Sequence, residues 1–157
     1  MKIVFVCTGN MSRSPFAECV LRQMLHERGI EGVEVSSVGT SYLEQSLRDP
    51  MMVEMAAKYG YRMGGMAVYM TPEELNSADV VLIMSRNHRN KVTSTLNSSH
   101  WDRIHLFLDY CCGIDEDVPD PYFGTESLYR RVCEQIIAAC NALADKISSG
   151  KIRQTEV

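Results

Sequence analysis

Residues 7–15 of the chain read CTGNMSRSP, and this stretch joins two different hydrophobic patterns. Before it, Lys2–Cys7 is an apolar run rich in β-branched residues, which predicts a buried strand. After it, apolar residues recur at helical spacing as far as Leu25, and Gly29 is suited to end that helix. We expect Ser14 to cap the helix, with Pro15 in its first turn. The stretch therefore predicts a strand, a tight turn and a helix.

The same alternation of patterns continues along the chain. Further strands are predicted at Val33–Val38, Val80–Met84 and Ile104–Leu108. Further helices are predicted over residues 50–58 after an Asp49 cap, in a short segment capped by Thr71, and over residues 87–96 and 126–147. We read residues 109–125, rich in Asp, Gly and Pro, as one long loop. Alternating strands and helices predict an α/β fold, a parallel sheet covered on both faces, in a single domain spanning residues 1–157.

Composition narrows the classes of function. The net charge of −4 does not favour nucleic-acid or membrane partners. No signal peptide is recognised at the N-terminus, and the six cysteines are expected to be reduced thiols in a cytoplasmic protein. The cysteines form no C-x-x-C pair and no two histidines have ligand spacing, so neither a metal site nor a cofactor is expected. We also expect a monomer.

Residues 7–14 combine the features of a phosphate-binding site with those of a nucleophile. A tight turn before a helix N-terminus offers backbone N–H groups and a positive dipole to an anion. Arg13, six residues after Cys7, can bind two phosphoryl oxygens, and this positive potential favours the Cys7 thiolate. The alternative is a buried core thiol, since a bare C-x5-R match is weak. The strand before the motif and the helix after it favour the catalytic interpretation.

Residues 7–15 and the segment Asp120-Pro121-Tyr122-Phe123 together resemble the low-molecular-weight protein tyrosine phosphatase family. The resemblance covers essentially the whole chain and implies a four-stranded parallel sheet in a three-layer α/β/α arrangement, the phosphotyrosine phosphatase I-like fold. It implies that Cys7 is the nucleophile, Arg13 the phosphate ligand and Asp120, in a matching D-P-Y motif, the general acid and base. The residues alone also favour Asp120 over Asp49, because the loop after the fourth strand shares the catalytic edge of the sheet.

Two further groups of residues are expected to contact the substrate. One is the turn itself, where Gly9 and Asn10 tolerate unusual backbone angles and Ser14 can donate a hydrogen bond to the thiolate. The other is a set of aromatic walls that clamp a flat aryl group. The predicted phosphate-binding or substrate-binding residues are Thr8, Gly9, Asn10, Met11, Ser12, Ser14, Tyr42, Tyr122 and Phe123.

The chain departs from the family pattern in three places. Ser12 stands where many members carry a second cysteine that shields the nucleophile, so oxidation of Cys7 should be less reversible. Ser85 stands where many members carry an aspartate after the third strand. A histidine often found in mid-chain is replaced near Gly64-Gly65. These changes concern the hydrogen bonds that support the site.

We therefore predict a protein-tyrosine phosphatase that hydrolyses phosphotyrosine in protein substrates through a cysteinyl-phosphate intermediate. A protein-arginine phosphatase is a close alternative, because that branch resembles residues 84–88, but it tends to carry a small Thr where this chain has Met11. A thioredoxin-coupled arsenate reductase would need resolving cysteines after the third strand, and Cys111-Cys112 is a poor substitute. A phosphate-binding module without turnover is disfavoured because both Cys7 and Asp120 are present.

Overall fold

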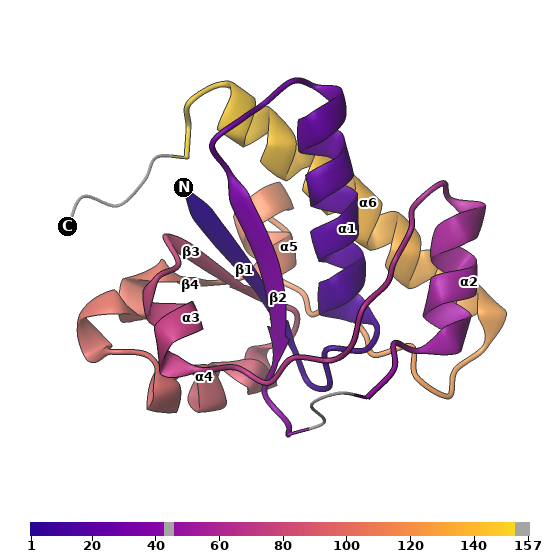
Figure 1. Cartoon of the computed structure of the whole chain (residues 1–157), viewed down its shortest axis with the longest axis horizontal. Coiled ribbons are helices and arrows are strands. Elements are labelled where there is room, and N and C mark those ends of the chain that lie inside the picture. The colour runs from indigo at the N-terminus through magenta and orange to yellow at the C-terminus, as the bar shows by residue number, and fades with distance from the viewer. Residues whose placement is uncertain (43–45, 153–157) are drawn as a thin grey trace.

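A four-stranded parallel sheet forms the centre of the protein (Figure 1). The structure is a computed structural model, and it describes residues 1–42 and 46–152. The strands are β1 (Lys2–Cys7), β2 (Glu34–Gly39), β3 (Val80–Ile83) and β4 (Ile104–Leu106), in the spatial order β2-β1-β3-β4. The register pairs Cys7 of β1 with Gly39 of β2, and Val6 with Ile83 of β3. The predicted parallel sheet is confirmed.

Helices connect the strands and follow the sequence patterns closely. Asp49 caps α2 (Pro50–Lys58) by accepting a hydrogen bond from the backbone of Met51, and Thr71 caps α3 (Pro72–Asn76), as the sequence predicts. None of the helices within residues 1–42 and 46–152 is long and apolar enough to cross a membrane. The helices are α1 (Arg13–Glu27), α2 (Pro50–Lys58), α3 (Pro72–Asn76), α4 (Arg89–Thr95), α5 (Phe107–Cys112) and α6 (Glu126–Ser148), with 3-10 turns at Arg86–His88 and Ser98–Arg103.

Each face of the sheet carries its own hydrophobic core. On one face, Phe5 and Leu82 pack with buried residues of α1, α2, α5 and α6. On the other, Val4 and Val81 pack with buried residues of α3 and α4. In Figure 1, α1 and α6 accordingly lie on the opposite side of the sheet from α3 and α4. Successive residues of a strand point to opposite faces of the sheet, and in these strands the residues on both faces are apolar. The sheet therefore has a core on each face, which confirms the three-layer arrangement.

The interpretation of residues 104–112 was partly wrong. The fourth strand ends at Leu106, and Phe107–Cys112 forms α5 rather than the strand end and the start of a long loop. Leu108 and Cys111 are buried in the core together with Phe107, and Gly113 ends the helix at a φ of 70°. The apolar run Ile104–Leu108 hides this change, because a short buried strand and the first turn of a buried helix have the same composition. Cys111 is therefore a core residue.

Candidate active site

The topology brings the ends of β1 and β3 together at the carboxyl edge of the sheet. From β1 the chain passes through α1 to β2 on one side, and β3 lies on the other side of β1. A crevice at such a reversal of strand order is where open α/β sheets bind their ligands. Residues 8–12, which we call the phosphate loop, lie there between β1 and α1. The fold therefore places the predicted motif at the expected ligand position.

The conformation of the phosphate loop depends on Asn10. Asn10 has a φ of 54°, so the left-handed residue of the loop is Asn10, whereas Gly9 is not among the glycines with positive φ. The Asn10 amide is fully buried, and its nitrogen donates to Ser14 Oγ at 2.9 Å and to Ser37 Oγ at 2.8 Å. Its oxygen accepts from the backbone N–H of Val68 at 2.9 Å. These bonds offset the cost of a left-handed non-glycine residue.

Gly39, the last residue of β2, is required by the close approach of the loop. A Cβ at this position would lie 2.9 Å from the Thr8 carbonyl oxygen and 3.0 Å from the Asn10 nitrogen. Such distances are too short for any side chain, so a glycine is needed here for steric reasons. Sequence reasoning assigned Gly39 no role, although a glycine directly after a predicted strand is a usable signal.

Cys7 lies at the base of the pocket, where its sulfur contacts a hydroxyl group. The Cys7 Sγ and Ser14 Oγ atoms are 2.9 Å apart, and both side chains are buried. Because a thiolate can only accept hydrogen bonds, ionised Cys7 accepts a hydrogen bond from the Ser14 hydroxyl. The predicted capping role of Ser14 was wrong: α1 begins at Arg13, and Ser12 is its N-cap residue, without a side-chain capping bond.

Arg13 is held by groups from three parts of the chain. Its Nη1 donates to Ser85 Oγ at 2.8 Å and to the Val118 carbonyl at 3.0 Å, and its Nη2 donates to Thr8 Oγ1 at 3.4 Å. Ser85, at the position of the family's aspartate, accepts a hydrogen bond from the guanidinium but brings no negative charge. The Arg13 side chain is 5% exposed, so its positive charge acts on the pocket with little solvent screening.

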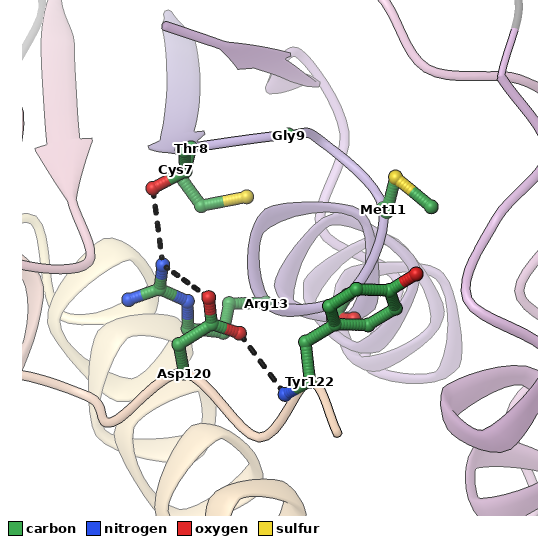
Figure 2. A pocket seen from close by; sticks show the side chains of 8 residues that line it. Cys7, Thr8, Gly9, Met11, Arg13, Asp120 and Tyr122 are labelled. Carbon is green, nitrogen blue, oxygen red and sulfur yellow. Dashed lines mark hydrogen bonds and ion pairs between the residues drawn. The ribbon is translucent and has the colours of Figure 1, made fainter. Parts of the chain in front are cut away.

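The predicted catalytic residues meet in one pocket of about 140 Å³. Asp120 Oδ2 lies 3.8 Å from Arg13 Nη2, and Asp120 Oδ1 accepts from the Tyr122 backbone N–H at 3.1 Å. In Figure 2, Met11 and the Tyr122 ring lie on one side of the pocket and Arg13 and Asp120 on the other. The pocket is lined by Cys7, Thr8, Gly9, Met11, Ser12, Arg13, Asp120 and Tyr122.

The other predicted contact residues lie behind or outside this pocket. Asn10, which is part of the loop, and Ser14, in the first turn of α1, are both fully buried. Phe123 is 91% exposed, has a φ of 63° and contacts the Tyr122 ring at a centroid distance of 4.1 Å. Tyr42 is 73% exposed and contacts Tyr69 edge to face. Neither Tyr42 nor Phe123 lines the pocket, so a wall role for either requires a substrate larger than the pocket itself.

His88 supports the phosphate loop through a hydrogen bond to Thr8. Its Nδ1 accepts the backbone N–H of Ser85 at 3.1 Å, so in the neutral ring Nε2 carries the proton and donates to Thr8 Oγ1 at 2.9 Å. Burial, with the charge of Arg13, lowers the pKa of His88 to about 4, so the ring is neutral at neutral pH. Sequence reasoning missed His88, because nothing local links residue 88 to residue 8.

Asp49 ties the phosphate loop to two helices. Its Oδ2 accepts from Ser12 Oγ at 2.7 Å and from the Tyr129 hydroxyl at 2.6 Å, while its backbone N–H donates to the Met11 carbonyl at 3.0 Å. Ser12, at the position of the family's second cysteine, therefore anchors the loop to the start of α2 and to α6. The predicted capping role of Asp49 is confirmed, and this anchoring adds to it.

A metal site and further reactive thiols are the other chemistry that histidine, cysteine and acidic side chains could provide. Within residues 1–42 and 46–152, no group of His, Cys, Asp and Glu side chains is placed to hold a metal ion. All six cysteines are free thiols. Burial raises the pKa of Cys19 and of Cys133 to about 12, so both remain protonated at neutral pH.

Known proteins are similar to this chain over nearly its full length. A Synechocystis protein, named as a candidate low molecular weight protein-tyrosine-phosphatase, is 33% identical, with 91% of this chain and 94% of that protein covered. The solved protein tyrosine phosphatase of Entamoeba histolytica is 28% identical, with a TM-score of 0.89 and coverage of 97% and 99%. A serine variant of the YwlE arginine phosphatase, with its active-site serine phosphorylated, is 28% identical, with a TM-score of 0.88 and coverage of 94% and 96%.

Membership of a family follows from a profile match as well as from these relatives. The family described as low molecular weight phosphotyrosine protein phosphatase matches residues 2–153. The match contains both the phosphate loop and the segment around Asp120, and the fold agrees with the solved relatives. The chain is a phosphatase and belongs to the low molecular weight phosphotyrosine protein phosphatase family.

Proposed function

We propose that this phosphatase hydrolyses phosphotyrosine in proteins, with Cys7 as nucleophile, Arg13 as phosphate ligand and Asp120 as general acid and base. The observation that carries the proposal is the single pocket that these three side chains share with Met11 and Tyr122. Met11 and Tyr122 offer apolar surface beside the phosphate site, which favours a flat aryl group over a charged guanidinium.

The chemistry proceeds in two displacements at phosphorus. The Cys7 thiolate attacks phosphorus, a sulfur–phosphorus bond forms, and the bond from phosphorus to the phenolic oxygen breaks while the Asp120 carboxylic acid protonates that oxygen. Water then attacks the cysteinyl phosphate, the Asp120 carboxylate takes its proton, and the sulfur–phosphorus bond breaks to release inorganic phosphate and the thiolate. Arg13 and the loop amides bind the phosphoryl oxygens in both steps.

A protein-arginine phosphatase remains the second candidate. The relative whose active-site serine is phosphorylated is named an arginine phosphatase, and its phosphorylated side chain supports a covalent phosphoenzyme at Cys7. The apolar surface of Met11 and Tyr122 is what favours phosphotyrosine over phosphoarginine. We further propose that the protein acts as a monomer in the cytoplasm, a reducing compartment that keeps a nucleophilic thiol such as Cys7 active.

The test is a comparison of kcat/KM for a phosphotyrosine peptide and a phosphoarginine peptide of otherwise identical sequence. We expect a strong preference for phosphotyrosine, with Cys7→Ser lacking turnover but still binding orthovanadate. A preference for phosphoarginine would leave the roles of Cys7, Arg13 and Asp120 intact and refute the aryl specificity. Full activity in Cys7→Ser would refute the covalent mechanism.

A further inference from the structure

Arg48 lies beneath the phosphate loop and outside the pocket, and its contacts concentrate on one residue of that loop. Its Nη1 donates to Asn10 Oδ1 at 2.7 Å and also to the Asn10 backbone carbonyl. Its Nε donates to the Gly64 carbonyl at 3.0 Å. Arg48 is 9% exposed, so a long cationic side chain is buried where it contacts the backbone of the loop.

We propose that Arg48 is a positioning residue for phosphate transfer: its guanidinium holds Asn10 in the left-handed conformation on which the phosphate loop depends. The inference rests on the proposed function and adds a residue that lines no part of the catalytic pocket. It also gives a steric reason for Gly65, which lies in the region where the family often has a histidine.

The first argument is the geometry of Asn10. A non-glycine residue at a φ of 54° is strained, and contacts with its neighbours must hold it there. The two Nη1 bonds fix both the carbonyl and the side chain of Asn10, so the guanidinium resists rotation of either. Fixing the Asn10 amide also fixes the hydroxyl beside the nucleophile, because the amide nitrogen donates to Ser14 Oγ and Ser14 Oγ contacts Cys7 Sγ.

The second argument is the space that the guanidinium occupies. Gly65 has a φ of 81°, and a Cβ built there would lie 3.6 Å from Arg48 Nη2. A longer side chain at residue 65 would compete with Arg48 for this volume. Gly65 therefore leaves room for the Arg48 guanidinium, whereas a Cβ built at Gly64 would meet no atom within 4 Å. Where the family's histidine is missing, an arginine from another segment lies close to Gly65.

The third argument is electrostatic. Arg48 lines a cleft of about 650 Å³ behind the loop, together with Glu18, Cys19, Arg22, His26 and Arg62. Burial lowers the pKa of Arg48, while the Glu18 carboxylate and an ionised Cys7 thiolate work in the opposite direction. An arginine remains charged under all these influences, so it places a fixed positive charge behind the phosphate loop.

The test compares Arg48→Met, Arg48→Lys and Asn10→Ala with the double variant Arg48→Met/Asn10→Ala, using an aryl phosphate as substrate. Arg62→Met is the matched control, because Arg62 lines the same cleft but is exposed. We expect Arg48→Met to lower kcat/KM at least about 10-fold and to raise the inhibition constant of inorganic phosphate, while Arg62→Met leaves both near wild type. Because Arg48 acts through Asn10, the two losses should not add. The kcat/KM of the double variant should lie within about twofold of the kcat/KM of the less active single variant.

The outcomes separate this role from a merely structural one. If Arg48→Met lowers the melting temperature while kcat/KM and phosphate inhibition stay at wild-type values, the proposal is wrong. Fully additive losses in the double variant would also overturn it. If Arg48→Met does not fold, Arg48→Lys is the deciding variant, because a lysine keeps the positive charge but lacks the planar guanidinium with its several N–H donors. Weaker inhibition of Arg48→Lys by phosphate supports the proposal, and inhibition equal to that of the wild type refutes it. Failure of the proposed function is distinct, since the wild-type protein itself would then lack activity.

Discussion

Replacing Asp49 by alanine should destabilise the protein more than the loss of an ordinary helix cap. Asp49 is 3% exposed and accepts three hydrogen bonds, from the Met51 backbone, Ser12 and Tyr129. Loss of the cap costs about 1 kcal/mol. Each hydrogen bond to the carboxylate contributes about 1.5–3 kcal/mol, and the buried Tyr129 hydroxyl would be left without its acceptor.

Part of this loss is offset, because removing the carboxylate also removes the cost of burying its charge. We therefore expect Asp49→Ala to lower the free energy of unfolding by about 3–5 kcal/mol. For a domain of this size each kcal/mol corresponds to about 2–4 °C, so the melting temperature should fall by about 10 °C.

The assay is urea denaturation followed by circular dichroism, with Tyr129→Phe and the double variant measured alongside. Tyr129→Phe removes a single donor, so we expect a loss of about 1–2 kcal/mol in that variant. In the double variant the second change should cost little once the first is made. A loss below about 1 kcal/mol in Asp49→Ala, or full additivity of the two changes, would refute the idea that this carboxylate joins the loop, α2 and α6.

Three further predictions concern the site. Asp120→Asn should lower kcat on a phosphotyrosine peptide by about 10²–10⁴-fold while orthovanadate still binds, and an unchanged kcat would remove Asp120 from the mechanism. Met11→Thr should shift the ratio of kcat/KM values toward phosphoarginine by about 10-fold, because it removes apolar surface and adds a hydroxyl; an unchanged ratio contradicts Met11 as the selective residue. The pKa of His88 is about 4, below the value of about 6.5 in the unfolded chain, so its contribution to stability is complete above pH 6.5 and is lost as the pH falls toward 4. Denaturation between pH 7 and pH 4 should therefore show a loss of up to about 3 kcal/mol that is absent in His88→Asn, and equal slopes would exclude His88 as the cause.

Local patterns in the sequence determined most of the element order. The apolar run Lys2–Cys7, the helical spacing after Pro15 and the caps at Asp49 and Thr71 each depend on neighbouring residues, and each appears in the structure where it was expected. The motif from Cys7 to Arg13 was also readable, because a strand, a turn and a helix in succession already bring its residues together.

Other parts of the site were decided by tertiary structure alone. Contacts between His88 and Thr8, Arg48 and Asn10, or Tyr129 and Asp49 join residues 38 to 80 positions apart. Such contacts depend on the strand order β2-β1-β3-β4 and on the packing of α2 and α6, which hydrophobic periodicity does not encode.

The same reason explains α5 and the departures from the family pattern. Whether Phe107–Cys112 continues a strand or begins a helix is decided by the space beside α6, and not by its own composition. The sequence alone shows that the family's second cysteine, aspartate and histidine are missing. Only the folded chain shows what takes their places: Ser12 bonded to Asp49, Ser85 bonded to Arg13, and Arg48 beside Gly65. Those are side-chain contacts at a distance, and the fold must exist before they can form.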